Sequence, residues 1–197
     1  MKLNWAERWV VNNPTRVIQQ RIEINLLHRM ASLRPGALVL EIGCGRGVGA
    51  ALISKKFQPA IMHAMDLDFE MIKKAQKRSK NHNLKRAVSY VGDVLHLPYR
   101  DATFDAVFGF GVLHHVPEWR GGLAEIARVL KKGGCYFFEE LYPSLYQNFI
   151  TRHILLHPAE NRFKSEDWKD TLQEIKLFVQ RSVEQKKLGI LGVAIKE

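Results

Sequence analysis

Three carboxylates are spaced along the chain so that they could bind one small molecule. Glu41 ends an apolar run and lies two residues before Gly43, and Asp66 and Asp93 each follow a later apolar run. In a parallel sheet the carboxyl ends of the strands share one edge, where ligands bind. A carboxylate after the second strand can accept both hydroxyls of a ribose, and one after the third can accept from an adenine amino group. The alternative for Asp93 is a turn in which it bonds its own backbone.

Glycines alternate with other residues directly after Glu41, from Gly43 to Gly47. A loop without Cβ atoms lets the backbone approach a bound ligand. The segment 45–50 also fits the dinucleotide fingerprint, so a nicotinamide or flavin enzyme is an alternative. Glu41 argues against that alternative because its charge would repel a pyrophosphate. Asp66 does not discriminate, since NAD sites use an acid at the same place.

His114 and His115 are the candidates for a general base. They follow the fourth apolar run, and imidazole has an unperturbed pKa of about 6.5. The alternative is a structural role, with one ring buried and hydrogen-bonded and the other near the ligand. The remaining histidines show no metal-ligand spacing, and the two cysteines, Cys44 and Cys135, form no Cys-x-x-Cys pair. We therefore expect no metal site and no disulfide framework.

Alternating strands and helices must position these groups. Strands are predicted at 37–42, 61–65, 87–91, 104–109 and 135–140. Helices are predicted at 5–32 (interrupted at Pro14), 50–55, 69–80, 119–130, 144–156 and 165–175. A closing antiparallel hairpin is predicted from 177–183 and 188–195. We expect an α/β fold: a Rossmann-like, doubly wound, mostly parallel seven-stranded sheet with an antiparallel C-terminal hairpin and an N-terminal helical extension.

The length of 197 residues fits a single domain. We divide it into an N-terminal helical lid (1–35), a cofactor-binding core (36–140), and substrate-side helices with the final hairpin (141–197). Trp5 and Trp9 lie one helical turn apart and either cover the substrate or dock the first helix. No apolar run approaches the roughly 18 residues of a membrane span, and no secretory signal is evident. We therefore expect a cytoplasmic protein; the sequence does not indicate its oligomeric state.

The formal net charge is +10, which favours encounters with anionic partners such as nucleic acid, acidic metabolites or membrane headgroups. Much of the excess lies on and just after one predicted helix: Lys73, Lys74, Lys77, Arg78, Lys80, Lys85 and Arg86. Apolar residues are interleaved with these cations, which is typical of the outer face of an amphipathic helix rather than of a surface that reads nucleic acid. A merely solvated basic surface is the alternative.

Six segments in order resemble the class I S-adenosylmethionine-dependent methyltransferases, with the small-molecule, methyltransferase-type-11-like branch most similar. They are Val39–Gly47 (VLEIGCGRG), Met65–Asp68 (MDLD), Gly92–Val94 (GDV), Phe104–Val107 (FDAV), Val112–Val116 (VLHHV) and Glu125–Gly134 (EIARVLKKGG). The resemblance covers about residues 36–140 and is specific as a set. The chain departs from the family at Lys132, where proline is frequent, and at Arg46, where a small polar residue is frequent.

The resemblance implies that S-adenosyl-L-methionine is the cofactor. It assigns the methionine part of this molecule to Glu41, Gly43, Cys44 and Gly45, and the ribose to Asp66. It places Leu67 against the adenine ring and assigns the adenine edge to Asp93 and Val94. Gly109 and Phe110 would line the sulfur. The methyl carbon of a sulfonium is already electrophilic, so the protein mainly aligns acceptor, methyl and sulfur. A general base is needed only if the acceptor carries a proton.

We expect the acceptor to be a small molecule. RNA or protein is an alternative that the positive charge permits, but no Asn/Asp-Pro-Pro-Tyr/Phe segment for a nucleic-acid base follows the fourth strand. A nicotinamide-dependent oxidoreductase is disfavoured by Glu41 and by Gly92-Asp93. A non-catalytic cofactor-binding module would be expected to lack Glu41, Asp66 or Asp93, and all three are present.

Overall fold

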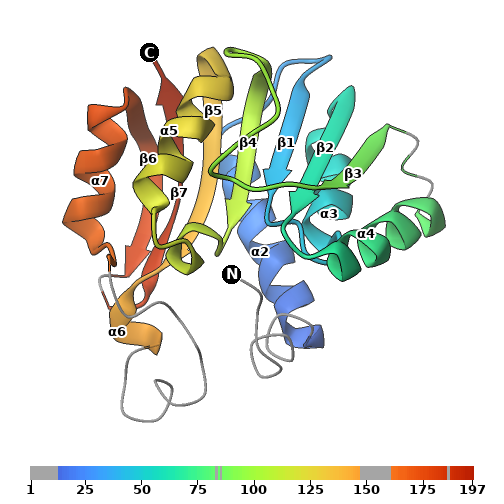
Figure 1. Cartoon of the computed structure of the whole chain (residues 1–197), viewed down its shortest axis with the longest axis horizontal. Helices are drawn as coiled ribbons and strands as arrows, with labels where there is room; N and C mark the ends of the chain where they lie inside the picture. The colour runs from blue at the N-terminus through green and yellow to red at the C-terminus, as the bar shows by residue number, and fades with distance from the viewer. Residues whose placement is uncertain (1–12, 83, 85, 147–160, 186) are drawn as a thin grey trace.

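A seven-stranded sheet forms the centre of the protein (Figure 1). The computed structural model describes residues 13–82, 84, 86–146, 161–185 and 187–197. The strands are β1 (Leu38–Ile42), β2 (Ile61–Asp66), β3 (Ala87–Val91), β4 (Phe104–Phe110), β5 (Leu130–Leu141), β6 (Leu177–Gln185) and β7 (Gly189–Lys196). Their order is β3-β2-β1-β4-β5-β7-β6, and only the pairs made by β7 are antiparallel. The predicted fold class is confirmed, including its C-terminal hairpin.

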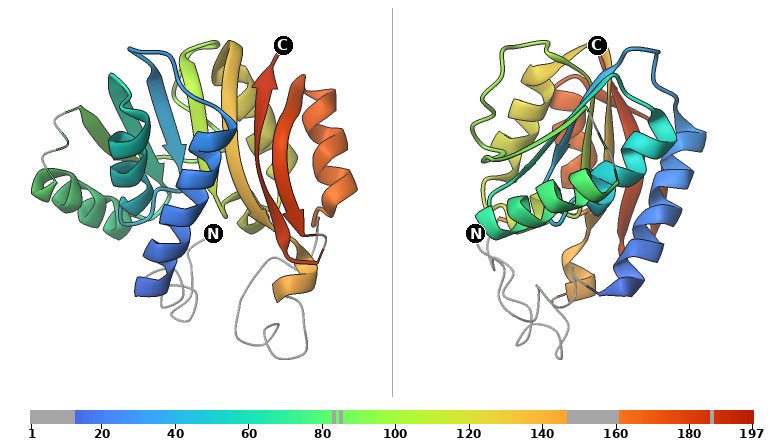
Figure 2. Two further views of the ribbon diagram at one scale, coloured as in Figure 1. Left: turned by 180° about the vertical axis from the view of Figure 1, so that it is seen from behind. Right: turned by 90° about the vertical axis from the view of Figure 1, so that its right-hand side faces the viewer.

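Helices cover both faces of the sheet. One apolar cluster joins the sheet to α2 (Pro14–Met30), α3 (Val48–Phe57) and α4 (Phe69–Asn81), and a second joins it to α5 (Trp119–Val129) and α7 (Ser165–Glu174). Figure 2 shows α2 and α3 on the back of the sheet as seen in Figure 1. The short helices η1 (Leu113–His115) and α6 (Pro143–Tyr146) follow β4 and β5, at the carboxyl edge of the parallel strands. This edge, at the bottom of Figure 1, is where the predicted site residues should meet.

The described part of the N-terminal extension is the helix α2. Its N-cap is Asn13, whose side chain accepts a hydrogen bond of 3.0 Å from the backbone N–H of Thr15, and Pro14 occupies the first turn. The helix α2 therefore begins at Pro14, the residue at which the sequence predicted an interruption. Ile24 and Leu27 are buried against the sheet, so α2 is part of the core layer. The predicted segments 5–12 and 147–156, with Trp5 and Trp9, lie outside the described residues, and a lid formed by 1–35 stays a prediction.

The boundary between α5 and β5 differs from the prediction. The sequence suggested a helix to residue 130 and a strand from 135, but α5 ends at Val129 and β5 begins at Leu130. Leu130 is fully buried and pairs with Phe104, which draws the chain into the sheet directly after the helix. The segment between Leu130 and Cys135 is accommodated by a shift in register against β4. Lys131 and Lys132 are therefore residues of β5 and do not cap α5.

Asp105 joins the beginnings of three strands at the opposite, amino edge of the sheet. Its carboxylate accepts from the backbone N–H of Leu38 at 2.8 Å, from Lys131 at 2.9 Å and from Arg34 at 2.5 Å. Burial acts to raise the pKa of Asp105, but these hydrogen bonds and the charge of Lys131 together lower it. The edge away from the site is thereby fastened by one ionised side chain.

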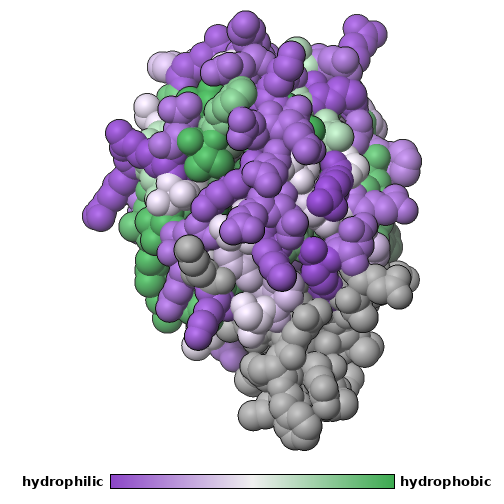
Figure 3. All heavy atoms as spheres, turned by 90° about the vertical axis from the view of Figure 1, so that its left-hand side faces the viewer, coloured by the Kyte–Doolittle hydropathy of each residue, from purple (hydrophilic) through white to green (hydrophobic). Residues whose placement is uncertain are grey.

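The end of the sheet formed by the hairpin is covered by α7. Figure 3 looks onto this side and shows a mostly hydrophilic surface in which apolar side chains gather only in small areas. The inner face of α7 instead buries Trp168 and Leu172 completely. Among the helices of the described ranges, none is both long and apolar enough to cross a bilayer.

Candidate active site

The glycine loop joins β1 to α3 and is held in an unusual backbone conformation. Gly43, Gly45 and Gly47 have φ values of 62°, 51° and 77°, in the left-handed region that favours glycine. The N–H of Cys44 donates to the carbonyl of Met65 at 2.8 Å, which fastens the loop to the end of β2. A Cβ on Gly45 would meet nothing within 4 Å, so open space lies beside the loop.

Glu41 lies beneath this loop and is 1% exposed. Gly49, in the first turn of α3, leaves the space that the Glu41 carboxylate fills, since a Cβ there would overlap Oε1. Oε2 is buried, and no group in the described part of the chain hydrogen-bonds to it. Burial raises the pKa of Glu41 well above its ordinary value, the nearby charge of Asp66 adds to this, and a backbone hydrogen bond from Ala50 opposes it. A buried acceptor oxygen without a partner suits a ligand that brings a donor or a positive charge.

Asp66 links the glycine loop to the end of β2. Oδ2 accepts from the N–H of Gly45 and Oδ1 accepts from the N–H of Asp68, both at 2.8 Å. The N–H of Gly92, after β3, donates to the carbonyl of Asp66 at 3.1 Å. The ends of the first three strands are therefore tied together at Asp66. Each carboxylate oxygen has further acceptor capacity for a hydroxyl, and the next residue, Leu67, presents an apolar side chain that is 46% exposed.

Asp93 is engaged in the turn that the sequence offered as its alternative role. Oδ1 accepts from the N–H of Leu95 at 3.0 Å, and the carbonyl accepts from the N–H of His96 at 3.1 Å. Val94 is buried close to Gly122 of α5. The turn holds this pair of residues at the end of β3, and their predicted contact with adenine stays a prediction.

The end of β4 lies directly beside the end of β1. Gly109 pairs with Ile42 in the parallel register, so its backbone adjoins the start of the glycine loop. The hydroxyl of Tyr136 lies against Gly109, where a Cβ would stand 3.3 Å from it, and this buried oxygen has no partner within the described ranges. The ring of Phe110 is 7% exposed and stacks with Phe108 on the α2 and α3 side of the sheet.

The turn after β4 is held by Glu140, at the end of the predicted strand 135–140. Glu140 is fully buried, and its carboxylate accepts from the backbone N–H groups of Val112 (3.3 Å), Leu113 (2.9 Å) and His114 (3.2 Å). The Nδ1 of the His114 ring lies 2.8 Å from the same carboxylate. Val112, held by this bond, packs onto the glycine loop so closely that a Cβ on Gly43 would overlap it. One side chain thus fixes the turn against the loop.

The protonation of this cluster follows from its burial. Burial raises the pKa of Glu140 to about 8, although its three backbone hydrogen bonds oppose the shift. Burial, with the positive charges of Arg162 and Arg16, lowers the pKa of His114 to about 3. His114 is therefore a neutral imidazole at physiological pH, and its Nδ1 is hydrogen-bonded to the Glu140 carboxyl. This is the structural role given above as the alternative for one of the two histidines.

His115 is half-buried beside His114, with 4.3 Å between the ring centroids. Its backbone N–H donates to the carbonyl of Val112 at 3.0 Å, which closes the single turn of η1. His115 therefore lies nearer to solvent than His114 and is the better placed of the two for contact with an acceptor. Its role as a base stays a prediction.

Glu139, the neighbour of Glu140, faces the opposite side of the sheet. Strand side chains alternate between faces, so Glu139 points to α2, where Arg16 binds both Glu139 (3.2 Å) and Glu23 (2.9 Å). Burial and the charge of Glu23 raise the pKa of Glu139 to about 8, while Arg16 opposes the rise. The two consecutive glutamates thus join β5 to α2 on one side and to η1 on the other.

The site consists of a turned glycine loop, three strand-end acids and two buried oxygens, Glu41 Oε2 and the Tyr136 hydroxyl, that have no hydrogen-bond partner in the described part of the chain. The profile of the methyltransferase-domain family matches residues 40–138, which span every one of these groups. The chain belongs to the class I S-adenosylmethionine-dependent methyltransferases. The pairing order of the seven strands and the place of the glycine loop in this structure agree with that assignment.

Relatives of this methyltransferase include enzymes that act on lipids. It is 37% identical over 126 residues to the phthiotriol/phenolphthiotriol dimycocerosates methyltransferase of Mycobacterium tuberculosis, covering 63% of this chain and 46% of the relative. It is 35% identical over 125 residues to the fatty-acid O-methyltransferase of Mycolicibacterium smegmatis, covering 62% and 44%. The match thus spans less than half of the length of either relative. A solved SAM-dependent methyltransferase from Aquifex aeolicus shares the fold, with a TM-score of 0.71, 21% identity, and coverage of 94% and 99%.

The groups that sequence reasoning missed in this chain are those that pack against the site residues and support them. Glu139 and Tyr136 carry no motif of their own, and Val112 was noted only as the first residue of the segment 112–116. The signal that could have found the first is the pair of glutamates ending an apolar strand. Since alternate residues face opposite sides, two adjacent buried acids need two separate sets of partners.

Proposed function

We propose that this chain transfers the methyl group of S-adenosylmethionine to an oxygen atom of a small, lipid-like acceptor. The observation that carries the proposal is the meeting of Glu41 and Asp66 at the glycine loop, with the buried Oε2 of Glu41 lacking any donor in the described part of the protein. The cofactor carries an ammonium and two ribose hydroxyls, which are donors of the kinds that these carboxylates accept.

The residues present fit this cofactor. Gly43, Cys44 and Gly45 would hold its methionine part above Glu41, and Asp66 would accept from the ribose hydroxyls. Leu67 would be covered by adenine, which would account for the exposure of this apolar side chain. Asp93 with Val94, and Gly109 with Phe110, would complete the adenine and sulfur ends.

The bound cofactor supplies a methyl group that is already electrophilic. The residues of this chain then contribute orientation and the exclusion of water, which is positioning chemistry. Glu140 fixes the turn that carries His114 and His115, so the acceptor side is preorganised as well as the loop, although by a different contact. The neutral ring of His114 is bound to Glu140, and His115 is the residue that could take a proton from a hydroxyl acceptor.

The lipid-like acceptor is supported by the relatives, which include a fatty-acid O-methyltransferase and a methyltransferase of phthiotriol lipids. The first name specifies methylation of a fatty acid at oxygen, and the second specifies dimycocerosates of phthiotriol or phenolphthiotriol. A fatty acid presents a carboxylate, and an alcohol or phenol presents a hydroxyl, so both offer an oxygen nucleophile. RNA or protein as acceptor remains the second candidate because of the charge of +10.

Two measurements test the proposal. Calorimetric titration should give binding of S-adenosylhomocysteine and no binding of NAD; binding of NAD alone would assign the glycine loop to a nicotinamide enzyme. Incubation with methyl-labelled cofactor and separate pools of fatty acids, phenolic lipids, RNA and protein should label the lipids. Label in RNA or protein alone would overturn the acceptor class, and label in no pool despite cofactor binding would indicate a binding module.

A further inference from the structure

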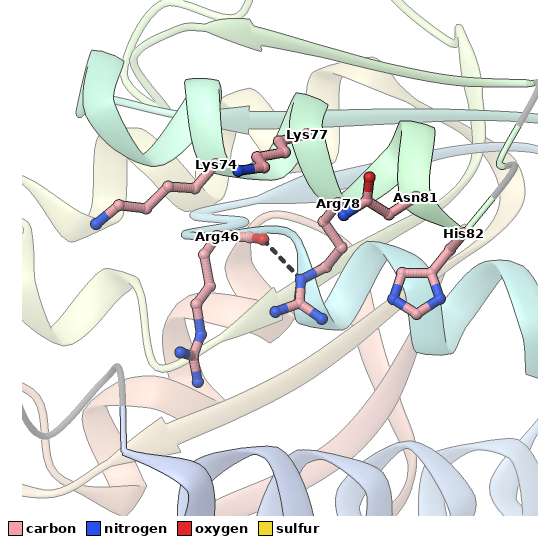
Figure 4. A pocket seen from close by; sticks show the side chains of 6 residues that line it. All are labelled: Arg46, Lys74, Lys77, Arg78, Asn81 and His82. Atoms are coloured by element: carbon pink, nitrogen blue, oxygen red, sulfur yellow. Dashed lines mark hydrogen bonds between the residues drawn. The ribbon is translucent and has the colours of Figure 1, made fainter.

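The outward face of α4 and the neighbouring glycine loop carry a concentration of cations that methyl transfer does not use. Arg46, Lys74, Lys77, Arg78, Asn81 and His82 line a hollow of about 270 Å³ (Figure 4). None of its four cations forms an ion pair with a carboxylate in the described part of the chain. The acid closest to it on the helix, Glu70, is bound instead to Lys73 at 2.9 Å.

The two arginines of the hollow are held close together by the fold. The Nε of Arg78 donates to the backbone carbonyl of Arg46 at 3.1 Å, which aims the rest of its guanidinium at the hollow (Figure 4). Burial, and then the charge of Arg78, lowers the pKa of Arg46. The Nε of Arg46 is buried and has no acceptor among the described residues. Two arginines and two lysines thus line one hollow, and no carboxylate of the described residues forms an ion pair with any of them.

The geometry points to a docking surface for the phosphates of an anionic membrane. This inference extends the proposed function and rests on it. A protein that is held at a bilayer can reach a lipid-like acceptor that is dissolved in the bilayer. Guanidinium and ammonium groups bind phosphate oxygens, and each Lys or Arg at an anionic surface contributes to the attraction. The hollow is open, and long flexible side chains line it, which suits headgroups that lie in a plane.

The position of the hollow matches this purpose. Arg46 belongs to the loop that follows β1, and α4 begins at the end of β2, so the cations lie along the same edge of the sheet as the site (Figures 1 and 2). Phe69, the first residue of α4, is 59% exposed, and the Nζ of Lys73 lies 4.5 Å from its ring centroid. An exposed aromatic ring beside cations is typical of a helix that lies at a membrane interface.

Single-stranded nucleic acid fits this surface less well. Proteins that bind it combine cations with aromatic rings on which bases stack, and His82 is the one ring among the six lining residues. The face is therefore equipped to hold charge but not to hold bases.

The test measures binding to sedimenting vesicles of phosphatidylcholine with and without phosphatidylglycerol, in the absence of cofactor and acceptor. We expect binding to the anionic vesicles alone, weakening as salt is raised. The double variant Lys74→Gln/Lys77→Gln should bind on the order of 30-fold more weakly. The matched control Lys55→Gln/Lys56→Gln removes the same charge from the last turn of α3, where both lysines are exposed, and should bind like the unaltered protein.

Several outcomes would overturn the inference. Equal weakening of both double variants would show a dependence on total charge alone. Displacement of the protein from vesicles by inorganic phosphate at matched ionic strength would show an isolated phosphate site, and stronger binding to RNA that Lys74→Gln/Lys77→Gln abolishes would assign the face to nucleic acid. Because Lys74 and Lys77 lie outside the cofactor site, methylation of a short, water-soluble fatty acid should be unchanged in that variant, which separates failure of this inference from failure of the proposed function.

Discussion

The two halves of the site are built by different means. On the cofactor side, the loop from Gly43 to Gly47 takes its shape from its own backbone and is fixed by bonds to Met65 and Asp66. On the acceptor side, the turn 112–115 is held by a single buried carboxylate from another strand, Glu140. The first half is local in sequence, whereas the second depends on a contact across 26 to 28 residues.

This difference teaches where the protein can vary. A loop determined by glycines tolerates little change at Gly43, Gly45 and Gly47, because a side chain at any of the three strains the backbone and one at Gly43 also meets Val112. A turn determined by one distant acid can change its own side chains while the acid continues to bind its backbone N–H groups. The cofactor side is thus fixed by the glycines of its own loop. The acceptor side is fixed by the hydrogen bonds of Glu140.

The largest effect should come from Glu140→Ala. Three backbone N–H groups would lose a buried acceptor and the Nδ1 of His114 would lose its hydrogen-bond partner, and each unsatisfied group costs about 1–3 kcal/mol. We expect a loss of at least about 3 kcal/mol in the free energy of unfolding, measured by urea denaturation. Glu140→Gln keeps one acceptor oxygen and should recover part of this loss. If both variants are as stable as the unaltered protein, the turn is held by other contacts and the comparison fails.

Asp66→Ala tests the cofactor half. Two hydrogen bonds from ribose hydroxyls to a charged acceptor should be lost, and we expect roughly 100-fold weaker binding of S-adenosylhomocysteine by calorimetry. The control is Asp68→Ala, which removes the same charge two residues away and the N-cap of α4. It should cost about 1 kcal/mol of stability while the affinity stays the same. Equal loss of affinity in both variants would show an effect of charge or of the helix rather than of ribose binding.

His115→Ala distinguishes the acceptor classes. A carboxylate acceptor has no proton to lose at neutral pH, so methylation of a fatty acid should proceed at a similar rate. A phenolic acceptor should be methylated about 100-fold more slowly, which is the lower end of the contribution of a general base. The comparison of kcat for the two acceptors, with cofactor affinity as the reference, measures this. A phenol that is methylated at an unaltered rate would leave His115 without a role in proton transfer.

The smallest effect should come from Asp105→Asn, far from both halves. The hydrogen bonds of Asp105 lower its pKa in the folded protein. Its contribution to stability is therefore present above about pH 3.9, the value in the unfolded chain, and is lost as the pH falls through the lower folded value. At neutral pH we expect a loss of about 1 kcal/mol, with cofactor affinity unchanged. A stability difference that persists below both pKa values would have to come from packing instead of charge.

Much of the fold could be predicted from the sequence because its signals are local. The apolar runs, Pro14 and the capping residue Asp68 each act within a few residues, and the observed helices and strands follow them. The beginning of β5 was missed because the burial of Leu130 against Phe104 depends on a strand that lies about 26 residues earlier. The lysines and glycines after Leu130 have the composition of a helix end. The packing of Leu130 against Phe104 overrides this local signal.

The candidate site divides in the same way. Glu41, Asp66 and Asp93 could be singled out because each ends an apolar strand, and the structure brings the three strand ends together. Glu140 could not be singled out in this way, because three of its four partners are backbone N–H groups that leave no mark in the sequence. The turn bond of Asp93 was foreseen as an alternative, since aspartate commonly bonds the backbone two residues on.

The clasp that Asp105 makes at the amino edge has a consequence for how such a protein can be rebuilt. Asp105 fastens the beginnings of β1, β4 and β5 at the amino edge, away from the candidate site. Residues at the carboxyl edge can therefore be exchanged without loss of these contacts. A designer who wishes to change the proposed acceptor site could replace residues of the turn 112–115 at the carboxyl edge and leave Asp105 and its partners untouched. In that sense the scaffold separates what must stay constant from what is free to diversify.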